Sequence, residues 1–191
     1  MTRFFWVRHG PTHAKSMIGW TDLPADLSDL DALRRLRASL PAAGVTVSSD
    51  LARAVTTADA LCTGHRLPHD TALREIHFGT WEQRTFTEVE SEAPDRIRAF
   101  WDQPGQVRAP GGEGWDDLTQ RVWAATDRLI TAHPGADIVI VAHFGAILAA
   151  LQRALGIAAV QVFAHKIDNL SVTELILGPA GWQVGRINHR A

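Results

Sequence analysis

The chain has 191 residues, of which 46% are hydrophobic and 21% are charged, with a net charge of −2 and one cysteine. This length fits a single domain over residues 1–191. The charge argues against the basic face that nucleic-acid binding needs, and no apolar run reaches the length of a membrane span or a signal-peptide core. We therefore expect a cytoplasmic protein with no nucleic-acid or membrane partner.

In the first half of the chain, apolar runs alternate with helical periodicity. The run from Phe4 to Val7 ends at Gly10-Pro11, which indicates a strand buried on both faces. Ser28 is a suitable N-cap for the next helix, whose leucines recur at helical spacing until Pro41. The predicted elements are a strand at 3–8, a long loop at 10–27, a helix from Ser28 to Leu40, a strand at 45–47 and a helix at 52–62.

The second half of the chain begins irregularly and then returns to this alternation. The predicted elements are a short strand near Leu73, one or two helices of which one begins after Pro94, a loop at 102–114, a long helix at 115–133, a strand at 137–142, a helix at 145–155 and a closing hairpin of 171–177 with 182–187. Strands that alternate with helices predict a three-layer α/β/α sandwich with a mostly parallel central sheet. Such sheets bind ligands at the carboxyl ends of their strands.

Arginine and histidine side chains follow three of the predicted strands. Arg8 and His9 end the first strand, Arg53 lies just beyond the second, and His143 ends the most apolar one. Each residue also has an ordinary structural interpretation. Arg8 and His9 fit a turn, Arg53 fits the N-terminal turn of a helix, and His143 fits the core. Their recurrence at one edge instead predicts a pocket for a phosphoryl group, because arginine grips two oxygens at once and a neutral imidazole attacks phosphorus.

Phosphoryl transfer also needs an acid that protonates the leaving oxygen. The stretch from Leu73 to Glu82 offers Glu75 and Glu82, both among apolar and aromatic residues. Such surroundings raise the pKa of a carboxyl group and keep its proton in place. For Glu82, a surface or capping role is an equally good interpretation.

Five segments of the chain carry a further signal when they are taken together. They are Arg8-His9-Gly10-Pro11-Thr12, Gly19-Trp20-Thr21-Asp22, Ser48-Ser49-Asp50-Leu51-Ala52-Arg53-Ala54, Leu73 to Glu82, and Val141-Ala142-His143-Phe144-Gly145. In this order they resemble the signature of the histidine phosphatase superfamily, which has the phosphoglycerate mutase-like fold. Within it, the chain is similar to the α-ribazole phosphatases and the broad-specificity phosphatases of bacteria.

The resemblance implies a role for each matching residue. His9 would be the phosphorylated nucleophile, and Arg8, Arg53 and His143 would hold the phosphate. Glu75 matches the position of the general acid. The other residues that the resemblance places at the substrate pocket are Thr12, Lys15, Gly19, Trp20, Thr21, Glu82, Glu113 and Phe144.

Two of these residues depart from the pattern of the family. Lys15 stands where many relatives carry Asn, which adds either a cation beside the phosphate or a solvated charge. Phe144 stands where they carry Gly, so its bulk either narrows the site or shifts the following turn. Both departures concern the substrate rather than the catalytic positions.

The expected function is a metal-independent phosphomonoesterase that hydrolyses a small phosphorylated metabolite through a phosphohistidine, with no cofactor. No histidine spacing fits a metal site, and the Gly-x-Ser-x-Gly and Walker motifs are missing. The alternatives are phosphoryl transfer of the phosphoglycerate mutase type and, ranked lower, a non-catalytic domain that binds a phosphorylated ligand. The identity of the substrate and the formation of a homodimer stay open.

Overall fold

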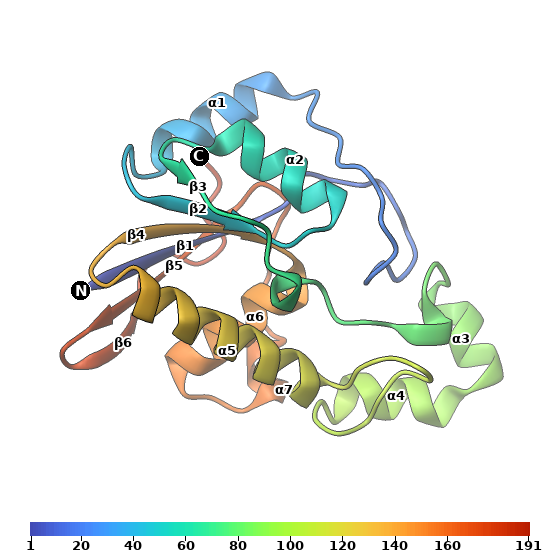
Figure 1. The fold of residues 1–191 in the computed structure, drawn as a ribbon. Coiled ribbons are helices and arrows are strands. Elements are labelled where there is room, and N and C mark those ends of the chain that lie inside the picture. Colours follow the sequence, from blue (N-terminus) through green and yellow to red (C-terminus); the bar gives the residue numbers. More distant parts are fainter.

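Parallel strands form the greater part of a six-stranded sheet at the centre of the protein (Figure 1). The computed structural model describes residues 1–191. Its strands are β1 (Thr2–Arg8), β2 (Val45–Ser48), β3 (His65–Arg66), β4 (Asp137–Ala142), β5 (Val172–Gly178) and β6 (Gly181–Val184), in the spatial order β3-β2-β4-β1-β5-β6. The first four are mutually parallel, whereas β5 and β6 run antiparallel to their neighbours.

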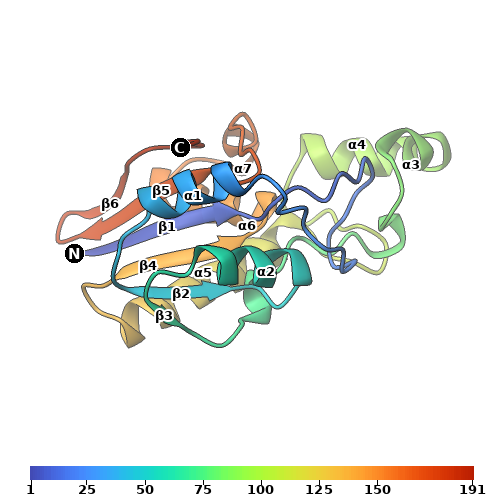
Figure 2. The ribbon, with the colours of Figure 1, turned by 90° about the horizontal axis from the view of Figure 1, so that it is seen from above.

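Helices cover both faces of this sheet. Figure 1 shows α1 (Leu30–Ser39) and α2 (Ala52–Leu61) on one face, and α5 (Trp115–Ala132) and α6 (Phe144–Leu155) on the other. The remaining helices are α3 (Phe86–Glu92), α4 (Pro94–Asp102) and α7 (Ala159–Val162). In Figure 2, α3 and α4 extend beyond the carboxyl end of β1, while the β5–β6 hairpin lies at the opposite end. The predicted α/β sandwich is confirmed.

The central strand β1 shows why the sheet needs helices on both sides. Its side chains alternate, so Phe4 and Trp6 join the apolar core under α5 and α6, and Phe5 and Val7 join the core under α1 and α2. All four are buried. Full burial of such a side chain stabilises the fold by about 1.5–3 kcal/mol. The continuous apolar run is therefore the signature of a strand enclosed by two layers.

Two local predictions need correction, and one short strand was not predicted. The helix α1 is capped by Asp29 rather than by Ser28, because the Asp29 carboxylate accepts a hydrogen bond from the backbone N–H of Ala32. The segment near Leu73 is a turn of 3₁₀ helix (Thr71–Leu73) rather than a strand. The edge strand lies earlier, at β3, where two residues pair with β2.

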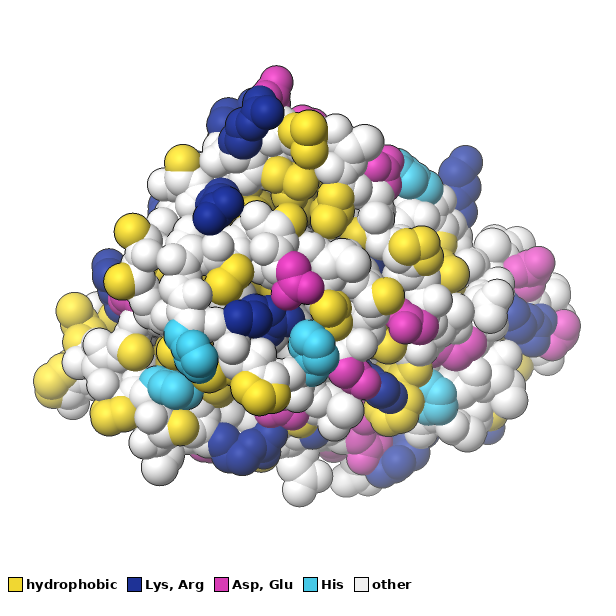
Figure 3. Space-filling model, turned by 45° about the horizontal axis from the view of Figure 1, so that its top comes forward, with side chains coloured by type: hydrophobic (Ala, Val, Ile, Leu, Met, Phe, Trp, Pro, Cys, Tyr) yellow, Lys and Arg dark blue, Asp and Glu magenta, His cyan; other side chains and the backbone are white.

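Charged side chains of both signs share the face of the molecule that Figure 3 shows. Lysine and arginine side chains are dispersed there among aspartate and glutamate, with apolar side chains between them. No helix of the structure combines the length and the apolar character that crossing a lipid bilayer requires.

Candidate active site

The carboxyl ends of β1, β2 and β4 bring the predicted residues to one edge of the sheet. The strand register pairs Arg8 with Ala142 and Ser48 with Val141. The residues that follow these strands are therefore neighbours, and the ring centroids of His9 and His143 lie 5.0 Å apart. A polar cavity opens here, lined by Arg8, His9, Thr12, Ala14, Ser16, Ile18, Arg53 and Glu75.

His9 is held as a neutral imidazole with one nitrogen free. Its Nδ1 lies 2.6 Å from the carbonyl oxygen of Gly10. Since a carbonyl only accepts, Nδ1 carries the proton and Nε2 keeps its lone pair. Burial is the main cause that lowers the pKa of His9, to about 3, and the positive charge of Arg53 adds to it. The side-chain amide of Asn169 donates to the carbonyl oxygen of His9 and fixes the backbone.

Two guanidinium groups, that of the buried Arg53 and that of the half-buried Arg8, border the polar cavity without a carboxylate partner. Arg53 is 1% exposed and donates to the carbonyl oxygens of Gly19 and Thr21, at 2.6 and 2.9 Å. Arg8 donates to the carbonyl oxygen of Ile167, and its Nε is buried with no partner. Burial lowers the pKa of both groups, yet arginine stays charged. Unpaired buried charge is costly, so this site suits an anion.

His143 completes the group of nitrogen donors at this edge. It is fully buried, and its Nε2 shares a 2.7 Å hydrogen bond with the Ser49 hydroxyl. Its Nδ1 is buried and has no partner in the protein. Burial is the main cause that holds the pKa of His143 well below its usual value, and the positive charges of Arg53, Arg121 and Arg8 add to it. The ring is therefore neutral in the free protein.

Glu75 is the carboxyl group of the polar cavity, and its environment favours the protonated form. Burial raises its pKa, although the backbone N–H groups of Gly145 and Ile76 donate to its oxygens. A Cβ atom at position 145 would lie 2.4 Å from Glu75 Oε1, so a side chain there would displace this carboxyl group. The conformation of this carboxyl group is thus set by backbone contacts and by the absence of a side chain at position 145.

Glu82 does not line the cavity, and its expected place in the substrate pocket is corrected. Its carboxylate accepts hydrogen bonds from the backbone N–H groups of Gly19, Trp20, Thr21 and Phe78 and from the hydroxyl of Thr21. Burial alone would raise the pKa of Glu82, but these donors together lower it. The ionised carboxylate thus holds the 19–21 turn, whose carbonyl groups in turn hold Arg53.

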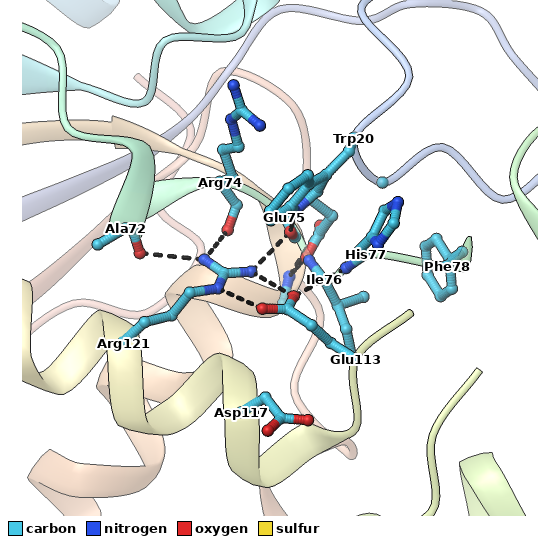
Figure 4. Close-up of polar contacts among 12 residues, drawn as sticks. Trp20, Ala72, Arg74, Glu75, Ile76, His77, Phe78, Glu113, Asp117 and Arg121 are labelled. Atoms are coloured by element: carbon cyan, nitrogen blue, oxygen red, sulfur yellow. Dashed lines mark hydrogen bonds and ion pairs between the residues drawn. The ribbon is translucent and has the colours of Figure 1, made fainter. Parts of the chain in front are cut away.

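Glu113 is also turned away from the cavity and pairs with Arg121 of α5 (Figure 4). Arg121 donates twice to this carboxylate, at 2.8 and 2.7 Å, and further to the backbone carbonyl oxygens of Ala72, Arg74 and Glu75. The backbone N–H of His77 donates to Glu113 as well. The pair therefore fixes, from behind, the loop that carries Glu75, and the expectation of a pocket carboxylate at position 113 is corrected.

Of the remaining predicted residues, some line a cavity and others support the residues that do. Thr12 lines the polar cavity, whereas Lys15 is exposed and lines no cavity. The Trp20 indole donates to the Glu75 carbonyl oxygen and stacks on the Arg74 guanidinium, 4.6 Å from the ring centroid. Phe144 borders a second cavity, and the Arg8 guanidinium carbon lies 5.4 Å from its ring centroid.

The sequence pattern of the histidine phosphatase superfamily (branch 1) matches residues 4–190. The chain belongs to this superfamily. A glucosyl-3-phosphoglycerate phosphatase of Mycolicibacterium vanbaalenii is 36% identical over 169 residues, which are 80% of this chain and 73% of that protein. A bifunctional protein of Mycobacterium tuberculosis is 31% identical over 192 residues, 91% of this chain but 50% of that protein. The chain thus spans about half the length of this relative.

The fold of this chain is also that of solved structures. The structure of Bacillus stearothermophilus YhfR superposes with a TM-score of 0.89, at 24% sequence identity, over 100% of this chain and 98% of that one. At this identity the likeness concerns the fold alone. The two chains therefore share their fold over nearly their whole lengths.

Some residues that support the candidate site carry no signal in the sequence. Arg121 lies on the polar side of a long amphipathic helix, where an arginine is typical of a solvated surface. Asn169 lies in a loop far along the chain from the His9 carbonyl group that it contacts. The Ser49 hydroxyl could have been found, since it follows a predicted strand at the same edge as His143.

The half-buried pair of Arg121 and Glu113 gives a stability prediction. Arg121→Met would leave a carboxylate and three carbonyl groups without their donor, so we expect a loss of about 3 kcal/mol in the free energy of unfolding. Arg128→Met, on the same helix, breaks the exposed pair with Asp70 and is expected to cost less than about 1 kcal/mol. Urea denaturation measures both variants, and equal losses would contradict the supporting role of Arg121.

Proposed function

We propose that the protein hydrolyses phosphomonoesters through a phosphohistidine intermediate on His9, without a metal ion. The observation that carries the proposal is that a neutral His9, whose Nε2 is free, shares one cavity with the buried Arg53 and the half-buried Arg8. Neither arginine has a carboxylate partner. Phosphoryl transfer requires chiefly positioning and positive charge around the phosphoryl oxygens. Arg8 and Arg53 supply that charge, and the unpartnered Nδ1 of His143 adds a hydrogen-bonding group.

The reaction divides into two displacements at phosphorus. In the first, the lone pair of His9 Nε2 forms the N–P bond, the ester P–O bond breaks, and Glu75 gives its proton to the departing oxygen. In the second, water attacks phosphorus, the N–P bond breaks, and the Glu75 carboxylate takes the proton of the water. The products are the alcohol, inorganic phosphate and the free enzyme. The raised pKa of Glu75 suits both the acid and the base step.

Rapid quenching in alkaline detergent, during turnover of a phosphomonoester with a labelled phosphoryl group, tests this proposal. We expect a labelled protein whose phosphoryl bond is stable in base and labile in acid, as a phosphoramidate is, and turnover that persists in excess chelator. A labelled protein that releases an isomerised phosphoester instead of inorganic phosphate would point to the mutase alternative. Binding without any labelled protein or product would point to a non-catalytic domain, and loss of turnover in chelator would contradict the metal-free mechanism.

A further inference from the structure

A second cavity adjoins the polar cavity, and the two share the carboxyl group of Glu75. We call it the aromatic cavity, because seven of its nine lining residues are hydrophobic. The empty space between its walls, open solvent included, is about 380 Å³, of which about 40 Å³ admits the centre of a water-sized sphere. Its six aromatic side chains are Phe78, Phe100, Trp101, Trp115, Phe144 and Phe163.

The walls of the aromatic cavity come from four helical segments and the loop after Glu75. Trp115 begins α5, Phe144 begins α6, and Phe163 follows α7. The α4 side chains Phe100 and Trp101 close the cavity from the segment that extends beyond the sheet (Figure 2). Trp115 and Phe163 meet edge to face, with ring centroids 4.7 Å apart, so the wall is ordered by its own packing.

The aromatic walls offer almost no hydrogen bonds to a polar guest. The indole N–H of Trp115 is used by the side chain of Gln152, at 2.7 Å. The indole N–H of Trp101 is buried and has no hydrogen-bond partner. Among the six aromatic side chains of the cavity it is the one free donor. A guest with several hydroxyl groups would lose its hydrogen bonds to water here and regain few of them. The cavity therefore favours flat, apolar groups.

Glu75 determines how a substrate spans the two cavities. Under the proposed function, its proton goes to the ester oxygen, so the bond that breaks lies within hydrogen-bond reach of Glu75. The phosphoryl group then lies with Arg8, His9 and Arg53 in the polar cavity. The rest of the ester begins at Glu75, where the aromatic cavity begins as well. Phe144 lies at the junction, since its ring also faces the Arg8 guanidinium group.

We propose that the aromatic cavity binds the leaving group, and that the preferred substrates are phosphomonoesters of alcohols that carry an aromatic or similarly flat apolar group. This inference rests on the proposed function. The proposed substrate class differs from the substrate that the glucosyl-3-phosphoglycerate phosphatases are named for. A sugar and a carboxylate need polar partners, and the walls of the aromatic cavity lack them.

The substrate preference of the unmodified protein is the first test. We would compare 3-phenylpropyl phosphate with 3-hydroxypropyl phosphate, because in both the substituent is three carbons from the ester oxygen and the leaving alkoxides are similarly basic. Burial of one phenyl ring predicts a kcat/KM about 10- to 100-fold higher for the phenyl ester. Similar rates, or a preference for the hydroxyl ester, would overturn the leaving-group assignment and leave the phosphatase function standing. Hydrolysis of neither ester would overturn the function itself and the assignment with it.

Variants of Trp101 provide the second test. The measured quantity is kcat/KM for the phenyl ester divided by kcat/KM for the hydroxyl ester. Trp101→Ala is expected to lower this ratio about tenfold. Trp101→Phe, which keeps a flat ring, is expected to retain most of the preference for the phenyl ester. Trp182→Ala is the matched control, since this half-buried tryptophan packs on Phe4 at the far end of the sheet (Figure 2). Should Trp101→Ala fail to fold, Phe163→Ala is measured in its place. An unchanged ratio in the alanine variant, or an equal fall in the control, would overturn the assignment.

Discussion

His9→Ala is expected to lower kcat/KM for every phosphomonoester by at least about 10³-fold, because the variant has no group that can form the N–P bond. The labelled protein of the trapping experiment is expected to disappear with it. Inorganic phosphate should still bind, since Arg8 and Arg53 keep the backbone partners that hold them. Steady-state kinetics and calorimetric titration with phosphate measure the two properties separately.

His13→Ala is the matched control for this experiment. His13 lies four residues further along the chain, is exposed and pairs with Asp26, so its loss should leave turnover unchanged. Turnover of His9→Ala at the rate of the unmodified protein would show that another group is the nucleophile. The pKa of about 3 adds a further expectation, because His9 of the free protein stays neutral as the pH falls to about 5. Protonation of His9 should therefore not limit kcat/KM in that range.

The regular elements were predictable because periodicity is a local property of a sequence. The apolar run of β4 and the apolar residues at helical spacing in α5 predict the bounds of these two elements to within one residue. The two-residue strand β3 has no period of its own, and only pairing with β2 makes it a strand. The turn of 3₁₀ helix near Leu73 is set by Asp70, whose carboxylate accepts from the backbone N–H of Ala72. Elements this short depend on contacts rather than on pattern.

The candidate site was predictable only where topology brings residues together. Parallel strands end at one edge, so the residues after β1, β2 and β4 had to meet once the fold class was inferred. The structural roles of Glu82 and Glu113 could not be inferred from the fold class in this way. Each carboxylate is committed to backbone N–H groups of a distant segment, 61 to 63 residues away for Glu82 and 36 for Glu113. No spacing in the sequence encodes these contacts.

Replacement of Glu75 by glutamine separates the chemistry of the leaving group from the rest of the reaction. The amide keeps the shape of the carboxyl group and an oxygen for the N–H groups of Ile76 and Gly145, but it has no proton to give. For alkyl phosphates, whose alkoxides need protonation, we expect kcat/KM to fall about 10²- to 10⁴-fold. For aryl phosphates with weakly basic leaving groups, the fall should stay within about tenfold, because such groups depart unprotonated. Parallel kinetics on the two substrate classes measure the difference.

The pH dependence provides an independent test of the acid. Burial raises the pKa of Glu75, so the protonated form persists above the usual range of a carboxyl group and is lost as the pH rises further. Hydrolysis of alkyl esters should therefore decline on the alkaline side, and that decline should vanish in Glu75→Gln. Glu82→Gln is the control, since the hydrogen bonds that lower the pKa of Glu82 keep it ionised and unable to donate. The acid role would pass to Glu82 under two conditions. Glu75→Gln would lower kcat/KM equally for alkyl and aryl esters, and Glu82→Gln would lower it for alkyl esters alone. The two carboxyl groups lie on one short segment, and their opposite pKa shifts are what assign the proton to Glu75.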